Sequence, residues 1–422
     1  MEYSKLKGTY DIIPEESDFF RNIKAKVESI LNISGYKKIE FPVIEKAELF
    51  IRGAGEASDI VVKKEMYTFE DRGHRMIALR PEGTASAVRL YLENSLSMQG
   101  YSSRMYYCGP MFRAENPQAG RYRQFTQYGV EYIGDEEPMV DVELIQLNSQ
   151  IFKALGLKKY TIFINSIGCR ECRPNYLFAL KKYFEDKIDK MCADCKKRYG
   201  TNVLRILDCK EESCKAFIKN APTGIDYLCE KCKEHFESLK NYLNNLKIPY
   251  QIDPGLVRGL DYYNRTVFEI KSELLGAQST ISAGGRYDYL IKELGGMETP
   301  ASGFAFGMER LAILIEKELG RAKKDFYIPP EVYVAYIGKE NLYSALEIIN
   351  RLRENGITAV TEYKYSNLKK HLRTADSMKA KFALFAGEDE IKSGEYTLRN
   401  LSTGEQTTGT IEEIIKTLLS YA

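Results

Sequence analysis

Arginines clustered between two apolar segments are the first feature of the sequence that could bind a substrate. Arg113 and Arg121 lie on either side of a turn that contains Pro117 and Gly120, and Phe125 follows. A guanidinium offers a rigid fork of donors that suits phosphate oxygens, and an aromatic ring nearby can stack on a base. The cluster fits a nucleotide-binding hairpin, and the alternative is an ordinary solvated hairpin tip.

Two shorter segments combine charged, hydroxyl or aromatic side chains with glycine. Glu82 and Thr84 flank Gly83 just before a helical pattern. This arrangement fits a ligand-binding loop, but it also fits a plain helix start that Thr84 caps. Arg258 lies beside a glycine and precedes a strand pattern with two successive tyrosines. A partly exposed strand edge would explain the alternation there, but less easily the arginine and both aromatic residues together.

A third segment, Gly303–Leu311, alternates small residues with phenylalanines and then begins a helix at Met308. Glycines let the backbone approach a nucleotide, and Arg310 in the first helical turn could reach a phosphate. The segment is not a Walker loop, because no Gly-Lys-Ser/Thr sequence follows, and it lacks the spacing of a dinucleotide fingerprint.

Eight of the nine cysteines form four close pairs in one region of the chain. The pairs are Cys169 with Cys172, Cys192 with Cys195, Cys209 with Cys214, and Cys229 with Cys232. Such spacing matches tetrahedral thiolate zinc sites, so the pairs could build two structural Zn²⁺ sites, or one site with spare thiols. The alternative is that reduced, buried cysteines pack a small helical module. A catalytic metal is not expected, because no water-activating histidine or carboxylate accompanies the pairs.

Composition limits the class of protein. The 422 residues, 44% of them hydrophobic, suffice for two or three domains. The net charge of +2 means that any RNA contact must come from local basic surfaces. No stretch approaches the roughly 20 apolar residues of a membrane span, so we expect a cytoplasmic protein with no membrane partner. Only three histidines occur, and none lies in a glycine-rich or charged motif, so imidazole catalysis is not expected.

The pattern of helices and strands predicts an α/β (α+β) fold with three domains. Mixed patterning runs through residues 1–165 and returns at 250–324, so these two segments form one domain. Residues 166–249 read as an inserted helical, cysteine-rich domain. Residues 325–422 read as an α/β domain, with expected strands at 332–337, 357–360 and 382–386, and expected helices at 342–354, at 368–378 and from 410 onward.

These segments together resemble the motifs of class II aminoacyl-tRNA synthetases, and of the histidyl-tRNA synthetase family in particular. Motif 1 is matched by Gly35–Pro42, motif 2 by Phe112-Arg113-x-Glu115 with its loop and Phe125, and motif 3 by Gly303-x-x-x-Gly307-x-Glu309-Arg310. The histidyl family is distinguished by Leu256–Tyr263, Ser282–Asp288, Arg80–Thr84 and Lys7–Pro14. The resemblance covers essentially the whole chain.

The resemblance implies a fold, a reaction and partners. The fold would be an antiparallel-sheet catalytic core with the cysteine-rich insertion and a C-terminal mixed-sheet anticodon-binding domain. The enzyme would activate L-histidine with ATP and Mg²⁺, transfer it to histidine tRNA, and form a homodimer through motif 1. In the terminal domain, a local basic face could contact tRNA phosphates, although most single lysines there also fit a solvated helix face. That face comprises Asn367, Lys369, Lys370, Arg373 and Lys379.

The resemblance also implies roles for the candidate site residues. Arg258 and Arg113 would be the catalytic cations, since charge develops on oxygens in both steps. The imidazole would be read by Glu131 and Gln127. The full histidine set is Glu82, Gly83, Thr84, Arg113, Gln127, Glu131, Arg258, Tyr262, Tyr263 and Tyr287. The ATP set is Arg113, Glu115, Arg121, Phe125 and Arg310.

Some features depart from this pattern or allow a rival. Asn116 and Thr126 differ from the residues common in the family, which bears on recognition of the tRNA acceptor end rather than on activation. The rival is a non-catalytic, synthetase-like regulatory subunit of ATP phosphoribosyltransferase. Such proteins typically lack the anticodon domain and have degraded the segment that here runs from Arg258 to Tyr263. We further expect the insertion to clamp the tRNA acceptor arm, with zinc compensating for its small core.

Overall fold

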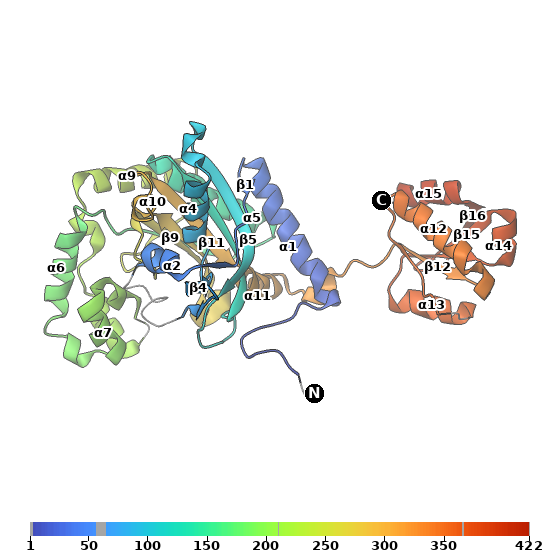
Figure 1. The fold of residues 1–422 in the computed structure, drawn as a ribbon, viewed down its shortest axis with the longest axis horizontal. Helices are drawn as coiled ribbons and strands as arrows, with labels where there is room; N and C mark the ends of the chain where they lie inside the picture. The colour runs from blue at the N-terminus through green and yellow to red at the C-terminus, as the bar shows by residue number, and fades with distance from the viewer. Residues whose placement is uncertain (1–2, 56–64, 210, 365–366, 422) are drawn as a thin grey trace. The chain divides into compact units, whose positions relative to one another are not determined.

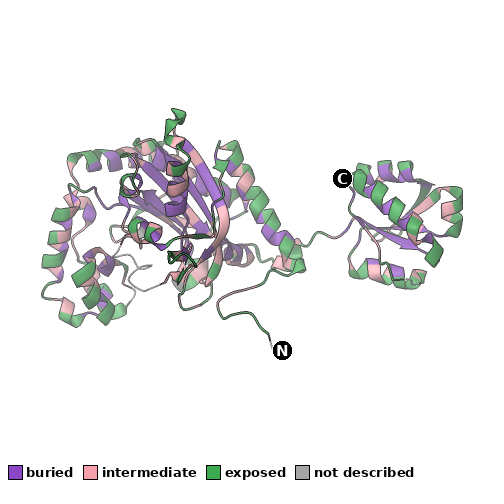
Figure 2. Cartoon of the chain, in the orientation of Figure 1, coloured by how far each residue is buried: buried purple, intermediate pink, exposed green. Residues whose placement is uncertain are grey.

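The computed structural model describes residues 3–55, 65–209, 211–364 and 367–421, except for the side chains of Ala54 and Ala277. It divides into two compact units, Met1–Asp325 and Phe326–Ala422 (Figure 1). Each unit has its own sheet and its own buried core (Figure 2).

An eight-stranded sheet forms the centre of the first unit. In spatial order its strands are β1 (Lys37–Lys38), β5 (Ser103–Phe112), β6 (Gln124–Ile133), β11 (Ala301–Gly307), β10 (Thr280–Arg286), β9 (Asn264–Lys271), β7 (Thr161–Ser166) and β8 (Gln251–Ile252). All neighbours pair antiparallel except β1 with β5 and β7 with β8, at the two edges. The expected antiparallel-sheet core is therefore confirmed.

Helices cover both faces of this sheet. On one face, α5 (Pro138–Ala154) packs on β10 and β11 and contacts α1 (Pro14–Ile33) and α9 (Glu230–Asn245). On the other face, α4 (Thr84–Glu93) contacts β6 and α2 (Ala47–Ala54). The unit also contains α10 (Leu290–Glu293), α11 (Met308–Leu319) and a small sheet of β2 (Ile44–Lys46), β4 (Met76–Leu79) and β3 (Tyr67–Glu70).

The segment between β7 and β8 is helical and rich in cysteine, as expected. Its helices are α6 (Arg173–Phe184), α7 (Ala193–Thr201), α8 (Glu212–Ile218) and α9, and they appear in green in Figure 1. Their small core contains Leu180, Phe184 and Ile206, packed with Cys195 and Cys214.

The second unit is a mixed sheet with helices. In spatial order its strands are β13 (Ala359–Val360), β12 (Val332–Tyr336), β14 (Phe382–Ala386), β15 (Glu395–Asn400) and β16 (Gln406–Thr410). Its helices are α12 (Leu342–Glu354), α13 (Leu368–Ser377), α14 (Glu388–Ser393) and α15 (Ile411–Ser420). The first three strands are parallel and the last two antiparallel, so the expected mixed sheet is confirmed.

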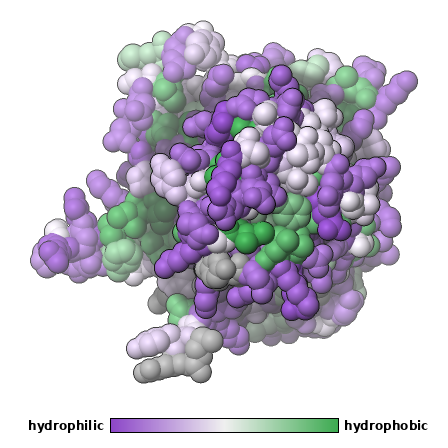
Figure 3. Space-filling model, turned by 90° about the vertical axis from the view of Figure 1, so that its right-hand side faces the viewer, coloured by the Kyte–Doolittle hydropathy of each residue, from purple (hydrophilic) through white to green (hydrophobic). Residues whose placement is uncertain are grey.

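Among the described residues, no helix combines the length and the apolar character needed to cross a bilayer. On the face drawn in Figure 3, hydrophilic side chains predominate and hydrophobic ones are confined to small patches.

Candidate active site

Strand β6 carries core residues on one face and candidate site residues on the other. Phe125, Gln127 and Glu131 share one face, because side chains along a strand alternate in direction. On the opposite face, the ring of Tyr128 stacks on that of Phe306 at 5.3 Å between centroids. The packing of one face thus fixes the direction of the polar side chains on the other.

Glu131 is a carboxylate buried without a cation. It is 1% exposed, and its Oε1 accepts hydrogen bonds from Thr84 Oγ1 at 2.9 Å and from the Tyr107 hydroxyl at 3.3 Å. Its Oε2 accepts from the Tyr287 hydroxyl. Burial raises the pKa of Glu131 to about 8, and in the described part of the chain no basic side chain pairs with it.

Glycines give this carboxylate the room it occupies. A Cβ added at Gly303, directly across from Glu131 in the ladder, would lie 2.1 Å from the Glu131 Oε2. A Cβ added at Gly129 would lie 2.0 Å from the Cζ of Tyr107. Real atoms do not approach so closely, so the two positions require glycine for packing reasons.

Glu82 caps the helix that carries Thr84. The Glu82 carboxylate accepts hydrogen bonds from the backbone N–H of Thr84 at 2.7 Å and of Ala85 at 2.9 Å. A helix does begin here, at Thr84, but the prediction that Thr84 caps it is wrong, because the Thr84 hydroxyl donates to Glu131 instead. Burial raises the pKa of Glu82.

Three tyrosines wall the space beside Glu131. Tyr262 lies 4.6 Å from Tyr263 and 5.6 Å from Tyr287, measured between ring centroids, and all three are buried. Gln127 lies on the same strand face as Glu131, and its Oε1 is buried without a hydrogen-bond partner among the described residues. The result is a buried aromatic cluster beside Glu131 in which one polar atom, the Gln127 Oε1, has no partner among the described residues.

Three of the predicted ATP-site arginines face a common space. Arg310 donates to the carbonyl oxygens of Gly120 at 2.9 Å and Thr280 at 3.0 Å. Burial, and then repulsion by Arg121 and Arg113, lowers its pKa to about 10. Arg113 and Arg121 therefore lie near enough to Arg310 for their positive charges to act on it.

The remaining motif 2 residues surround these arginines. Arg113 donates from Nε to the Pro81 carbonyl at 2.9 Å, and its guanidinium lies 5.2 Å from the ring centroid of Phe125. Arg121 forms an ion pair with Glu115 at 3.3 Å. The structure therefore brings together all five residues of the predicted ATP set.

Arg258 is held by a carboxylate that the sequence reading did not identify. Its Nη1 donates to Glu269 Oε1, and the other oxygen of Glu269 accepts from Thr280 at 3.2 Å and pairs with Lys271 at 3.3 Å. Burial opposes the charge of Arg258, but the attraction of Glu269 outweighs it and raises the pKa of the arginine. The sequence feature that could have indicated this role is a glutamate, Glu269, among the apolar residues of β9.

Tyr107 and Glu309 are two further contacts of the site without a predicted role. Either Tyr106 or Tyr107 could have faced Glu131, because the strand register was unknown. Glu309, named only as part of motif 3, accepts from the Thr126 backbone N–H at 2.7 Å and from the Tyr10 hydroxyl. These bonds connect the N-terminal segment, β6 and α11.

The family-specific Arg286 lies on the opposite face of the sheet and is structural. It is fully buried and donates to Asp141 at 3.1 Å and to Asp288 at 3.2 Å. Asp141 also accepts from His235 Nε2 at 2.9 Å and from the Ser302 hydroxyl at 2.8 Å. This network ties α5 and α9 to β10 and β11.

The four cysteine pairs assemble into two groups of four. The first group contains Cys169, Cys172, Cys229 and Cys232, and the second contains Cys192, Cys195, Cys209 and Cys214; within each, the sulfur atoms lie within 4.8 Å of one another. The Sγ–Sγ distances are 3.7 Å for Cys169–Cys172, Cys169–Cys229 and Cys192–Cys209, and 3.9 Å for Cys172–Cys232.

These distances fit a tetrahedral thiolate site. A disulfide requires about 2.05 Å between sulfurs, whereas a tetrahedron with Zn–S bonds of about 2.3 Å has an edge of about 3.8 Å. The donor set of both groups therefore suits zinc.

In the second unit, the predicted basic face is exposed on and around α13. Lys369, Lys370, Arg373 and Lys379 are all exposed. Asn367 is exposed too, but its side chain caps α13 by accepting from the Lys370 backbone N–H at 3.0 Å. The lysines and the arginine thus remain as candidate phosphate contacts.

Comparisons with known proteins agree with this geometry. The family model described as histidyl-tRNA synthetase matches residues 8–311, and the anticodon binding domain model matches residues 331–421. A histidine–tRNA ligase of Thermosipho melanesiensis is 48% identical over 407 residues, which is 96% of this chain and 95% of that protein.

Solved structures extend the likeness to the fold. The crystal structure of apo S. aureus histidyl-tRNA synthetase matches with a TM-score of 0.82 at 35% identity and covers 99% of both chains. A Bacillus halodurans structure described as an ATP phosphoribosyltransferase regulatory subunit/histidyl-tRNA synthetase has a TM-score of 0.64 at 21% identity. It covers 91% of this chain and 98% of that one, and at this identity it shows the shared fold alone.

Proposed function

This chain belongs to the histidyl-tRNA synthetase family and is a histidine–tRNA ligase, and on that premise we propose which of its residues carry out the reaction. In the first step the carboxylate of L-histidine attacks the α-phosphorus of ATP, which gives histidyl-adenylate and releases pyrophosphate. In the second, a terminal ribose hydroxyl of the tRNA takes the histidyl group and AMP leaves.

The histidine pocket is built around Glu131, and its burial without a cation is the observation that carries the assignment. An imidazole N–H adds a further donor to this carboxylate, and a protonated imidazole would supply the cation that it lacks among the described residues, while Gln127 offers a second polar contact. Thr84, the first residue of α4, and Glu82, just before that helix, line the pocket, with Gly83 between them. The aromatic wall consists of Tyr262, Tyr263 and Tyr287.

The ATP site is formed by the mutually repelling arginines. Arg113 binds the α-phosphate and positions the histidine carboxylate, while Arg121 and Arg310 hold the outer phosphates. Glu115 and Phe125 recognise the adenine. ATP enters with Mg²⁺, which shields part of the phosphate charge.

Arg258 is the second catalytic cation, close to the reacting carboxylate and the α-phosphate. Negative charge develops on oxygen atoms in both displacements, so fixed cations stabilise the transition state more than a general base would. Glu269 holds the guanidinium in one orientation before substrate arrives.

The test of this assignment is histidine-dependent exchange of pyrophosphate into ATP. We expect exchange supported only by histidine, and a loss of about a hundredfold or more in Arg258→Ala, because one preorganised donor is removed. Arg75→Ala is the control, since Arg75 is exposed and, among the residues that the structure describes, pairs only with the nearby Asp71 at 2.7 Å. If folded protein supports no exchange with any amino acid, the regulatory-subunit reading replaces the catalytic one.

The tRNA binds to three parts of the chain in this proposal. Residues 1–165 and 250–324 form the catalytic domain, which receives the 3′ end. The insertion, residues 166–249, clamps the acceptor arm. Residues 325–422 bind the anticodon, with phosphate contacts from Lys369, Lys370, Arg373 and Lys379.

Each group of four cysteines holds a structural Zn²⁺ ion. The tetrahedral sulfur spacing and the exclusively thiolate donors support this proposal. When bound, the metal cross-links short helices that have only a small core. Metal analysis should find about two zinc ions per chain, falling by one in either Cys229→Ser or Cys209→Ser; zinc-free wild type would overturn the proposal.

The chain works as a homodimer in the cytoplasm. The family resemblance puts motif 1 at the interface, and β1, within that motif, is an edge strand of the large sheet. Thiolate sites persist in a reducing compartment, which supports the location. Sedimentation analysis tests the dimer, and a monomer at micromolar concentration would contradict it.

A further inference from the structure

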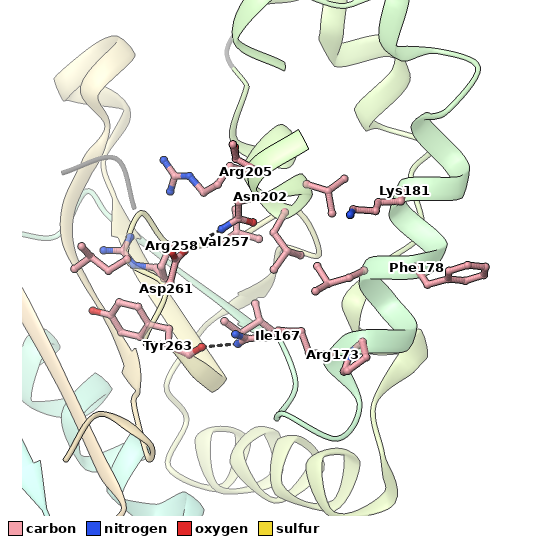
Figure 4. Close-up of a pocket in the computed structure, with 16 residues that line it drawn as sticks. Ile167, Arg173, Phe178, Lys181, Asn202, Arg205, Val257, Arg258, Asp261 and Tyr263 are labelled. Carbon is pink, nitrogen blue, oxygen red and sulfur yellow. Dashed lines mark hydrogen bonds between the residues drawn. The ribbon is translucent and has the colours of Figure 1, made fainter. Parts of the chain in front are cut away.

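Two residues of the insertion hold the segment that runs from Arg258 to Tyr263. Arg173 Nη2 donates to the backbone carbonyl of Tyr263, and Asn202 Nδ2 donates to Asp261 Oδ1 at 2.9 Å (Figure 4). These five residues line a cavity of about 570 Å³ between the insertion and the catalytic domain. The histidine pocket and the insertion therefore share one wall.

The position of Arg173 is set by the first group of cysteines. Arg173 directly follows Cys172 and begins α6, and its backbone N–H donates to the Cys169 carbonyl at 3.0 Å. The sulfur atoms of Cys169 and Cys172 lie within 4.8 Å of those of Cys229 and Cys232, which stand at the start of α9. Holding these four sulfurs together holds the backbone from which the Arg173 side chain projects.

The same cysteine hairpin contacts the catalytic domain on its other side. Arg170 pairs with Glu293 and lies 4.1 Å from the ring centroid of Tyr289, two residues beyond Tyr287 of the histidine pocket. Just before the hairpin, the Gly168 carbonyl accepts from the Arg265 backbone N–H at 2.9 Å. The hairpin is thus a junction between domains.

The second group of cysteines lies in a different environment. Cys195 and Cys214 pack with Val203 and Ile206 in the core of the insertion itself. Its contact with the segment runs through Asn202, at the far end of α7 from Cys192. The two groups therefore differ in how directly they bear on the histidine pocket.

We propose that the site formed by Cys169, Cys172, Cys229 and Cys232, through Arg173 as a positioning residue, fixes the Tyr262–Tyr263 wall of the histidine pocket. This inference rests on the pocket assignment proposed above. Zinc at this site then controls histidine activation even in the absence of tRNA, so the insertion does more than clamp RNA.

The first experiment compares variants in pyrophosphate exchange without tRNA. Arg173→Met removes the donor to the Tyr263 carbonyl and should raise the KM for histidine about tenfold, with a smaller change in kcat. Arg173→Lys keeps a charged donor and should recover part of the loss. The control is Arg198→Met, because Arg198 donates to the Arg205 carbonyl at 3.0 Å, wholly within the insertion. Its KM should stay within about twofold of wild type.

The second experiment separates the two metal sites by direct binding. Cys229→Ser and Cys209→Ser each remove one half-buried ligand from a different group. Both should lose one zinc ion, but only Cys229→Ser should weaken histidine binding about tenfold in calorimetric titration. Far-ultraviolet circular dichroism verifies that both variants remain folded.

Three outcomes would overturn the inference. If the KM for histidine is unchanged in Arg173→Met, Arg173 is not a positioning residue. If Cys229→Ser and Cys209→Ser weaken histidine binding equally, the two cysteine groups do not differ in their effect on the histidine pocket. Wild type that supports no histidine-dependent exchange removes the proposed site assignment together with this inference. Normal exchange by wild type alongside a neutral Arg173→Met removes the inference alone.

Discussion

Glu131 and Asp141 are two fully buried carboxylates on opposite faces of one sheet. Asp141 meets a guanidinium, an imidazole and a hydroxyl, from Arg286, His235 and Ser302. Glu131 meets only hydroxyls, from Thr84, Tyr107 and Tyr287. Burial opposes both negative charges, but among the described residues only Asp141 has a cation to offset that cost.

The pKa values of the two groups diverge for this reason. Burial would raise the pKa of Asp141, but the attraction of Arg286 outweighs it and holds the pKa well below its usual range. Burial raises the pKa of Glu131 to about 8, because hydroxyl donors alone do not offset it. A buried carboxylate that is paired with a cation stabilises the fold. A buried carboxylate without a cation is suited to bind a ligand that brings a donor or a positive charge.

The comparison is tested most strongly by Glu131→Gln. The amide keeps the shape of the side chain but loses the charge that receives the imidazole N–H. We expect kcat/KM for histidine in pyrophosphate exchange to fall by roughly 10³ to 10⁴, in line with sites that read a buried polar group. Stability should not fall, because no internal ion pair is broken. A loss below tenfold would mean that Glu131 does not read the substrate.

Asp141→Asn makes the same chemical change on the other face and should have the opposite profile. Removing the charge leaves Arg286 buried with Asp288 as its single counter-ion among the described residues. We expect the free energy of unfolding to fall by about 3 to 5 kcal/mol, measured by denaturant titration. The KM for histidine in the protein that remains folded should change little. A variant as stable as wild type would mean that the network on this face is dispensable.

Local sequence patterns predicted much of the fold around these groups. Strand β14 and helix α12 begin and end where the sequence pattern indicated, because their apolar periodicity is continuous. The hairpin of β15 and β16 was missed, since Leu398 is the single fully buried side chain in β15 and the strand pattern is faint. Continuous burial, rather than length, made an element predictable.

Contacts between segments that lie far apart in the sequence could not be predicted from the sequence pattern. Family motifs supplied Glu131 and Arg258, but Glu269 pairs with Arg258 only because a bend brings the residues before β9 back onto that strand. The grouping of the cysteine pairs likewise depends on how α6 to α9 fold, and spacing alone allowed several groupings. The role of Arg286 needed the position of Asp141, which lies far away in the sequence.

The pH dependence of the free energy of unfolding should also distinguish Glu131 from Asp141. The folded-state pKa of Glu131 lies above its ordinary 4.5, so its contribution to stability is present below pH 4.5 and is lost as pH rises through about 8. Because each pKa unit corresponds to more than 1 kcal/mol, histidine-free wild type should lose about 2 to 3 kcal/mol of unfolding free energy relative to Glu131→Gln between pH 5 and pH 7.

Asp141 behaves in the opposite sense. Its lowered pKa gives a contribution to stability that is present above its ordinary value of 3.8 and is lost as pH falls below that value.

The prediction for Glu131 is tested by measuring the free energies of unfolding of wild type and Glu131→Gln at pH 5, 6 and 7. Parallel curves for the two proteins would show that Glu131 is already ionised in the fold.

The smallest effect should come from the hydroxyls that hold Glu131. Tyr287→Phe removes the close donor to Oε2, and Tyr107→Phe removes the donor that lies 3.3 Å from Oε1. A hydrogen bond to a charged group contributes about 1.5 to 3 kcal/mol and weakens as it lengthens. We therefore expect histidine affinity, measured by calorimetry at pH 7, to fall about tenfold in Tyr287→Phe and about threefold in Tyr107→Phe. In the Glu131→Gln background both losses should shrink, because the charge that these hydroxyls stabilise is absent; undiminished losses there would mean that the tyrosines act on histidine directly.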